Sequence, residues 1–514
     1  MFGRAEQSER RASMRALAAR CPAAVYFVLI GSSVLVLILT LSVPSLAASP
    51  AAATPAVVAR ECSVGPDHAI FDGKSWYGLY WEGAKVGYMS GSAQMGDHEQ
   101  IVINTQLAMT LGEVLSEVSE QKIFASNPPH SLISGFIKRR EGHIRYLQED
   151  DGIQVSSESG VYDMPGHRWT LCDEDSVYMP DQLARLRPGA QFTSTYLDVE
   201  ALEVTRFDHV LHSVQQQSIE GSSHLFQTVL SKVQTKGTTT RIRQRYRDGE
   251  ALTLQLGQLE ARLQSQEQAQ GPIEKVDQIE LLTVKSNGRL DGSALGKIKT
   301  LLLKVKIDDP LARIDEVITD GQMQRVQIVD HKTAIARIAD YPAPPQPSKN
   351  SKDISNYLAA NFTYPVDHPR IKDLVESLRA QLPANVSDRA LAESLSTYVA
   401  GKIRYELVGT KSVLAMLDDP VGDCTEYSQL LVTLARANGL PAREVSGFIY
   451  YQDDPTNPNL GQFGGHAWVE IYINGRWQHM DPTAGEVSPN KSHVQFNQMM
   501  VRGLEFEILD AQYY

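Results

Sequence analysis

The stretch of the chain that decides the fold, residues 422–443, reads GDCTEYSQLLVTLARANGLPAR. Its apolar residues recur at helical spacing and share one face, namely Leu430, Leu431, Leu434 and Ala437. Gly439 and Pro441 follow, as is typical just beyond a helix C-terminus. Asp423 can cap the other end, so the pattern predicts a helix with Cys424 at its amino end.

The position of Cys424 allows two interpretations. At a helix N-terminus the dipole and the free N–H groups favour an anion, so a thiol there becomes more acidic and can serve as a nucleophile. In the other interpretation the cysteine is a small apolar residue that fills the start of the helix. Helix position alone does not decide between them.

Residues 464–483 have the pattern of a β-hairpin. Apolar and polar residues alternate up to Ile473, and Asn474-Gly475 is a strong two-residue turn. This turn predicts that Ile473 pairs with Arg476, and it fixes the register of the whole hairpin.

The register brings a histidine and an aspartate together. It places Trp468 opposite Asp481 and His466 opposite Thr483. His466 and Asp481 then share one face as diagonal neighbours, about 7–8 Å apart at the backbone and within hydrogen-bond reach of each other. Pro482 is expected to end the second strand there.

His479 competes with this pair, because it lies on the same face of the predicted hairpin, opposite Glu470. A zinc site is the alternative reading of the cluster, with ligands Cys424, His466, His479 and Asp481. A diagonal His466–Asp481 pair beside a cysteine at a helix N-terminus suits nucleophilic catalysis better than zinc binding.

Four ordered motifs carry a resemblance to a known family. They are Gly422–Tyr427, Ala435–Arg443, Gly465–Glu470 and Met480–Thr483, and they resemble the core of the transglutaminase-like superfamily in its bacterial branch. The resemblance covers about residues 350–514. It implies a papain-like α+β fold, in which the cysteine opens a helix that packs on an antiparallel sheet.

The same resemblance assigns roles to three residues. It implies that Cys424 is the nucleophile, His466 the base and Asp481 the carboxylate that orients the base. The chain shows no EF-hand-type calcium loop, since residues 453–457 lack the required spacing and glycine, and no cofactor is expected.

The rest of the body divides by composition. Residues 62–340 contain short alternating runs and are expected to be β-rich, although segments such as 257–268 are amphipathic enough for helices. A proline-rich linker is expected at 341–350, and the transglutaminase-like domain at 351–514. The role of residues 62–340 is left open by the sequence.

The first 61 residues are interpreted as a targeting region. Residues 1–20 are basic and residues 21–48 form an apolar segment, which is either a transmembrane anchor or a cleaved signal, followed by a spacer at 49–61. The positive-inside rule puts residues 1–20 in the cytoplasm, so a bacterial inner-membrane protein with a periplasmic body is expected. In that oxidising compartment Cys62 and Cys172 could pair, or both could stay unpaired.

These observations predict a function. The formal net charge of −12 argues against a nucleic-acid partner. The expected function is that of a membrane-anchored, extracytoplasmic cysteine hydrolase that cleaves amide bonds in a protein or peptide of the cell envelope. A protein-glutamine transamidase with the same triad is one alternative, and a non-catalytic envelope scaffold is the other.

Overall fold

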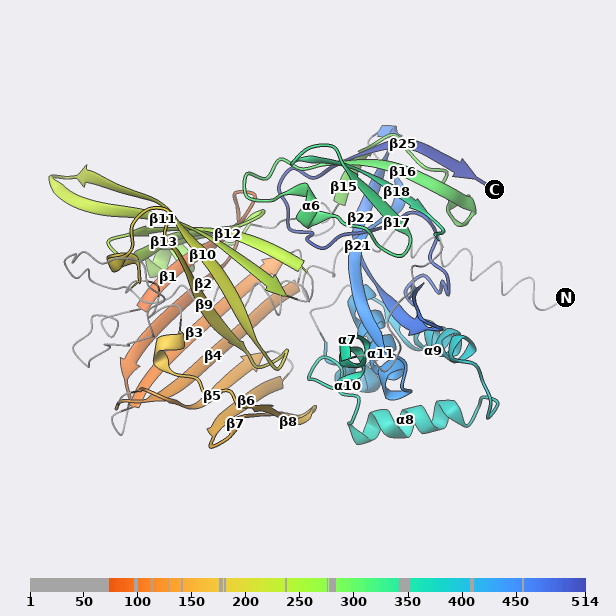
Figure 1. The fold of residues 1–514 in the computed structure, drawn as a ribbon, viewed down its shortest axis with the longest axis horizontal. Helices are drawn as coiled ribbons and strands as arrows, with labels where there is room; N and C mark the ends of the chain where they lie inside the picture. The colour runs from red at the N-terminus through yellow and green to blue at the C-terminus, as the bar shows by residue number, and fades with distance from the viewer. Residues whose placement is uncertain are drawn as a thin grey trace. The chain divides into compact units, whose positions relative to one another are not determined.

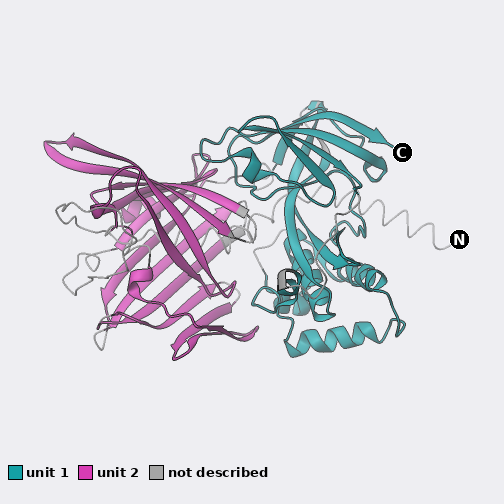
Figure 2. Cartoon of the chain, viewed as in Figure 1, with its two compact units in different colours: residues 1–29, 277–514 teal, residues 30–276 magenta. Residues whose placement is uncertain are grey.

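The computed structural model describes residues 74–514 apart from 97–99, 112–113, 128, 140–141, 175–178, 180–181, 236–237, 275, 277–282, 342–351, 407–410 and 455–456. The described chain forms two compact units that divide between residues 276 and 277 (Figure 2). Each unit is built around its own sheet.

The first of these units along the chain is a single antiparallel sheet of fourteen strands. They are β1 (Lys74–Trp81), β2 (Ala84–Met95), β3 (Gln100–Leu111), β4 (Val114–Ala125), β5 (Leu132–Arg139), β6 (Gly142–Glu149), β7 (Gly152–Ser157), β8 (Gly160–Pro165), β9 (Gln191–Asp198), β10 (Glu203–Ile219), β11 (Ser222–Thr235), β12 (Thr238–Arg247), β13 (Glu250–Leu256) and β14 (Leu259–Gln264). Strands β1 to β8 follow one another outward, and β9 to β14 return until β14 pairs with β1.

The predicted strand content of this region is confirmed in the described residues. The amphipathic segment 257–268 is mostly the strand β14, with a short helix α4 (Gln266–Ala269) at its end. Cys172 lies on a 3-10 turn, η3 (Leu171–Asp173), and is disulfide-bonded. Its predicted partner, Cys62, lies outside the described residues.

The second unit, residues 277–514, contains a nine-stranded mixed sheet. Its strands are β15 (Thr283–Asn287), β16 (Ile298–Lys306), β17 (Gln324–Ile328), β18 (Thr333–Ala339), β21 (Ala442–Asp454), β22 (Asn457–Ile473), β23 (Arg476–Met480), β24 (His493–Gln495) and β25 (Glu505–Tyr513). The order is β17-β18-β16-β25-β15-β22-β21-β24, with β23 paired to β22. Two short strands, β19 (Arg404–Tyr405) and β20 (Val421–Gly422), pair separately.

The predicted domain boundary at the proline cluster 341–350 does not coincide with the boundary between the units. Strands β15 to β18 precede that cluster, yet they join the sheet that contains β21 and β22. The sequence missed this because the pairing of β15 with β22 joins residues 175–181 positions apart in the chain, and the pairing of β16 with β25 joins residues 199–215 positions apart. The described part of the C-terminal unit therefore starts with β15.

The helices of this unit are α6 (Ile314–Val317), α7 (Lys352–Ser355), α8 (Pro369–Arg379), α9 (Asp388–Lys402), α10 (Val413–Asp418) and α11 (Cys424–Ala437), with 3-10 turns η4 (Leu295–Lys297) and η5 (Asn356–Leu358). Helices α7 to α11 gather around one end of β21 and β22, whereas α6 lies against β18 (Figure 1). The apolar spacing at Leu430, Leu431, Leu434 and Ala437 predicted α11, and this helix is confirmed.

A hydrophobic core joins the helices to the sheet. Its buried residues include Leu391, Leu395 and Val399 of α9, Leu430, Leu431 and Leu434 of α11, and Val469, Ile471 and Ile473 of β22. The leucines of the α11 face predicted from sequence thus belong to the core that α11 shares with α9 and β22. This packing fixes where the N-terminus of α11 meets the sheet.

Both predicted ends of α11 are confirmed. The Asp423 side chain accepts a hydrogen bond from the Thr425 N–H, and the Glu426 side chain accepts one from the Asp423 N–H, which together make a capping box. At the other end Gly439 has a φ of 75° and stops the helix.

The predicted membrane segment and spacer, residues 21–61, lie outside the described residues. Among the residues that the structure describes, no helix is both long enough and apolar enough to cross a membrane.

Gly422 is expected to be required at the start of α11. A methyl group there would lie 2.5 Å from Cβ of Glu426, so Gly422→Ala should displace the capping carboxylate and cost about 1–3 kcal/mol of unfolding free energy. Gly401→Ala is the control, because Gly401 is exposed in α9 with open space around it and should lose nothing or gain up to about 1 kcal/mol. Urea denaturation measures the unfolding free energy of both variants. An equal loss in the two would contradict a requirement for glycine at position 422.

Candidate active site

Cys424 is the first residue of α11, as predicted, and its side chain is fully buried. Cys424 is not part of a disulfide, and its side chain hydrogen-bonds His466. Its backbone N–H belongs to the first turn of a helix, where N–H groups lack intrahelical acceptors and stabilise negative charge. The thiol therefore has both a basic partner and a favourable field.

His466 lies where β22 changes neighbours. Up to Gly464 this strand pairs with β15, and from Val469 onward it pairs with β23, while β21 pairs along its other edge. His466 falls in the short stretch between the two pairings. Its Nε2 lies 2.9 Å from Oδ2 of Asp481, which leaves Nδ1 as the ring atom for Cys424.

The hairpin register predicted from sequence is confirmed, since Ile473 pairs with Arg476 and Val469 with Met480. The strand β23 ends at Met480, before the proline that was expected to end it. The predicted contact between His466 and Asp481 is present. Three residues that the resemblance grouped, Cys424, His466 and Asp481, thus meet in one buried cluster.

Asp481 is held on both of its carboxylate oxygens. Oδ1 accepts hydrogen bonds from the backbone N–H groups of Thr483 (3.0 Å) and Ala484 (3.3 Å). Oδ2 lies 2.9 Å from Nε2 of His466 and 3.2 Å from Nε2 of His493. The carboxylate therefore cannot rotate without breaking several hydrogen bonds.

The electrostatics of the pair follow from this geometry. Burial alone would lower the pKa of His466, but the charge of Asp481 and its hydrogen bond raise it to about 10. Burial alone would raise the pKa of Asp481, but His466 and His493 hold it well below its ordinary value. At neutral pH the pair is therefore an imidazolium and a carboxylate.

Two further carboxyl groups lie beside the thiol. Burial and the neighbouring Cys424 raise the pKa of Asp423 to about 8, and burial and Asp423 raise the pKa of Glu426 well above its ordinary value. Both shifts favour the protonated, neutral form of the capping carboxyl groups. This reduces the negative charge next to a thiolate at Cys424.

A second network supports the base from behind. The Trp468 ring stacks against His466 with centroids 6.0 Å apart, and its indole N–H donates to Nδ1 of His479 (2.8 Å). His479 in turn contacts Glu470 through Nε2 (3.0 Å), and Glu470 binds Arg443. Burial would raise the pKa of Glu470, but His479 and Arg443 lower it to about 2.

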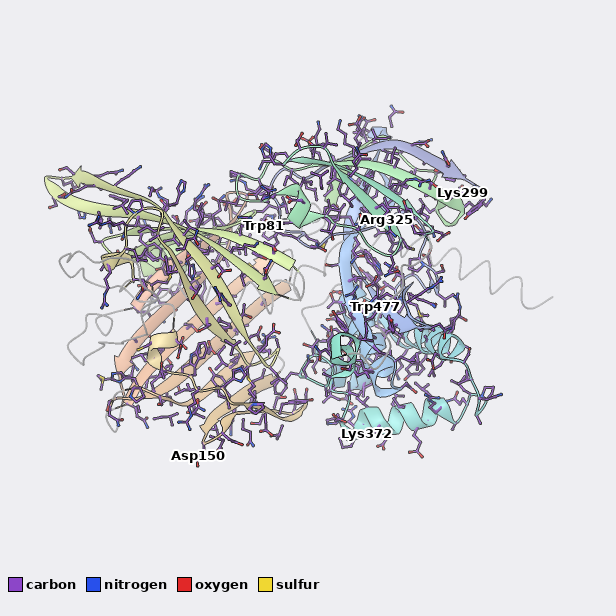
Figure 3. The ribbon with its side chains drawn as sticks, viewed as in Figure 1. Trp81, Asp150, Lys299, Arg325, Lys372 and Trp477 are labelled. Carbon is purple, nitrogen blue, oxygen red and sulfur yellow. The ribbon has the colours of Figure 1, made fainter. Side chains whose placement is uncertain are left out.

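Arg443 is anchored at the far end of this network. Its guanidinium lies 4.3 Å from the ring centroid of Trp477, a residue of β23 that is labelled in Figure 3. The predicted pairing of His479 with Glu470 is thus present. It directs His479 away from Asp481, so the zinc set that combined His479 with Cys424, His466 and Asp481 is not formed.

His493 was not predicted from the sequence. It is the first residue of β24, which pairs with β21 instead of with the preceding strand β23. Only this crossover brings the imidazole to Asp481, and its Nδ1 lies 3.1 Å from the carbonyl oxygen of Asn490. The sequence around His493 alternates between polar and apolar residues over only three positions, His493 to Gln495. A strand this short cannot be assigned a pairing partner from the sequence.

The Asp481→Asn substitution is expected to destabilise the fold in a pH-dependent way. The raised pKa of His466 contributes stability that is complete below about pH 6.5 and is lost as the pH rises toward about 10. The lowered pKa of Asp481 contributes stability above about pH 3.9 that is lost as the pH falls. The loss should be largest between about pH 4 and 6.5, at about 3–5 kcal/mol for one broken buried pair.

Urea denaturation of both proteins at pH 6 and pH 9 measures this difference. The Asp150→Asn change, at an exposed turn of the other unit, is the control and should stay within about 0.5 kcal/mol at both pH values. A destabilisation by Asp481→Asn that does not change with pH would contradict an ion pair at this site.

The fold and the site define an α+β domain in which a cysteine at a helix N-terminus meets a histidine–aspartate pair on a sheet. Residues 376–482 match the family model of the transglutaminase-like superfamily. The chain therefore contains a domain of this superfamily, as the sequence motifs predicted.

Curated proteins resemble part of the chain. A protein-glutamine gamma-glutamyltransferase of Pseudomonas aeruginosa is 28% identical over 203 residues, which are 37% of this chain and 29% of that protein. An uncharacterized protein of Mycobacterium tuberculosis is 30% identical over 142 residues, which are 24% of this chain and 43% of that protein. The chain thus spans less than half the length of these relatives.

Among solved structures, the periplasmic domain of TgpA from Pseudomonas aeruginosa shares 17% sequence identity with this chain. The match covers 39% of this chain and 93% of that one, with a TM-score of 0.26.

Proposed function

We propose that this protein is a cysteine hydrolase of the transglutaminase-like type, which cleaves amide bonds through a thioester intermediate. The observation that supports the proposal most strongly is the position of His466. Its ring forms one hydrogen bond with Cys424 and another with Asp481. A nucleophile, a base and an orienting carboxylate in hydrogen-bond contact are what covalent catalysis at an amide requires.

The reaction proceeds in two halves. The Cys424 thiolate, paired with the imidazolium of His466, attacks the amide carbonyl, and Nδ1 of His466 then protonates the leaving amine, which leaves the imidazole neutral. Water gives a proton to Nδ1 of the neutral His466 as it attacks the resulting thioester, which releases the acid and restores the thiolate–imidazolium pair. Asp481 keeps Nε2 protonated and stabilises the imidazolium, because its Oδ2 accepts from that nitrogen throughout.

The developing oxyanion needs donors close to the sulfur. The backbone N–H of Cys424 at the start of α11 is the donor we assign, since the first-turn N–H groups of a helix lack intrahelical acceptors. The raised pKa values of Asp423 and Glu426 limit the negative charge beside this position.

Transamidation is the second candidate, because one relative is named a protein-glutamine gamma-glutamyltransferase. In that reaction an amine replaces water as the group that attacks the thioester, and every residue keeps its role. The two activities therefore differ only in the acyl acceptor.

The proposal includes a cellular location for the reaction, outside the cytoplasm of a bacterial cell. The basic segment 1–20 and the apolar segment 21–48 favour a single membrane anchor with the body of the chain outside the cytoplasm. A protein or peptide of the bacterial cell envelope is the substrate class that this location supplies.

Incubation of the purified chain with a glutamine-containing protein and a fluorescent primary amine distinguishes the two activities. A hydrolase releases ammonia or peptide fragments with no fluorescence incorporated, whereas a transamidase labels the protein. Cys424→Ala should abolish either activity by at least about 10³-fold, because it removes the nucleophile. The matched control Ser428→Ala, one helical turn further along α11, should retain most of it.

A scaffold function gives a different result in cells. If Cys424→Ala restores the phenotype of a deletion strain as fully as the wild-type gene does, the protein does not act as an enzyme there and the proposal fails.

A further inference from the structure

Two histidines, His466 and His493, meet the carboxylate of Asp481, and together the three side chains could bind a metal ion. Nε2 of His466, Oδ2 of Asp481 and Nε2 of His493 all lie within 4.8 Å of one another, and all three residues are buried. Both nitrogens converge on the same carboxylate oxygen, at 2.9 and 3.2 Å. His493 has no part in the proposed reaction, so its convergence on this point calls for a separate explanation.

We propose that His466, Asp481 and His493 form a zinc site and that zinc bound there switches the cysteine off. Two imidazole nitrogens and one carboxylate oxygen are a common protein ligand set for Zn²⁺, with water at the fourth position. The observed nitrogen–oxygen separations are close to about 3.3 Å, the ligand–ligand distance in a tetrahedron with bonds of about 2.0–2.1 Å. The two imidazole nitrogens lie within 4.8 Å of each other, and the side chains would turn so that all three ligand atoms face the ion.

The surroundings of His493 resemble those of a metal ligand. A histidine that binds zinc almost always donates its other ring N–H to a carbonyl or carboxylate, which fixes the tautomer and the ring orientation. Nδ1 of His493 lies 3.1 Å from the carbonyl oxygen of Asn490, and the Trp468 ring packs edge-on against the His493 ring at 5.2 Å. Asp481 is oriented in the same way by the Thr483 and Ala484 N–H groups.

Zinc at this site is incompatible with turnover. An imidazole that gives its Nε2 lone pair to zinc carries its proton on Nδ1, so His466 can no longer accept the proton of the water that attacks the thioester. The ion also takes the Asp481 oxygen that orients the base. This inhibitory consequence rests on the proposed function, whereas the metal site itself does not.

Access to the site is no harder for the ion than for a substrate. The three ligands are as buried as Cys424, and the proposed reaction requires an opening that brings a peptide to the thiol. Such an opening also admits a hydrated ion. On binding, the protons held by the two ligating nitrogens are released to water.

Calorimetric titration of the full chain with Zn²⁺ alone tests the site, and it uses Cys424→Ala so that the thiol cannot be the ligand. One zinc ion is expected per chain. Adding His493→Gln should weaken binding at least about 30-fold, because one of the three ligands is lost. Adding His479→Gln is the matched control, since His479 is a buried histidine of the same hairpin whose ring faces Trp468 and Glu470, and it should leave binding unchanged.

X-ray absorption of the zinc-loaded wild-type chain gives a second readout. The expected shell holds nitrogen and oxygen near about 2.0–2.2 Å and no sulfur near about 2.3 Å. Sulfur in the shell, no zinc bound by Cys424→Ala, or binding that survives His493→Gln would each overturn the proposal. If His493→Gln unfolds the chain, as judged by circular dichroism, His493→Asn takes its place in the same comparison.

These results are separable from the failure of the proposed function. Zinc binding is measured in a variant that lacks the nucleophile, so it does not depend on whether the chain is an enzyme. Inhibition is then tested on the wild-type chain with the glutamine substrate, each variant being compared with itself in the absence of zinc.

Discussion

The buried carboxylate of Asp481 is the group on which the rest of the site depends. It is fixed by two backbone N–H groups on one oxygen and meets two histidines on the other. A buried charge is stable only when it is fully paired and hydrogen-bonded, so all of these contacts must form together. This requirement ties the hairpin, the loop after β23 and the strand β24 into a single arrangement.

The same requirement explains why the helix and the sheet meet where they do. His466 has to reach Asp481 with one nitrogen and Cys424 with the other, which sets the start of α11 against the middle of β22. The apolar face of α11 and the inner face of β22 supply the packing that holds this position. The capping box then makes Cys424 the first residue of the helix.

The parts of the site that could be predicted are those that local rules determine. The Asn474-Gly475 turn fixed the register of β22 and β23, and Asp423 with Gly439 fixed both ends of α11, because turn and cap chemistry act over a few residues. His493 could not be placed, since β24 skips its sequence neighbour to pair with β21.

The predicted domain boundary at 341–350 differs from the boundary between the two units, again because distant strands pair. Strands β15 to β18 join the C-terminal sheet through pairings with β22 and β25, which no local pattern in residues 283–339 encodes. The proline cluster at 342–347 marked a change of composition that is not the border between the two units. Composition reports local chain character, whereas a unit is defined by contacts between distant segments.

The most direct test of the central claim, an assembled cysteine–histidine couple, is the pH dependence of alkylation at Cys424, read by mass spectrometry on the intact chain. An ordinary cysteine titrates near about pH 8.5 and reacts slowly at pH 6, whereas an activated one remains a thiolate there. The account predicts fast labelling of Cys424 at pH 6 that His466→Ala slows strongly. Slow labelling at pH 6 that rises only above about pH 8, and is unchanged by His466→Ala, would contradict it.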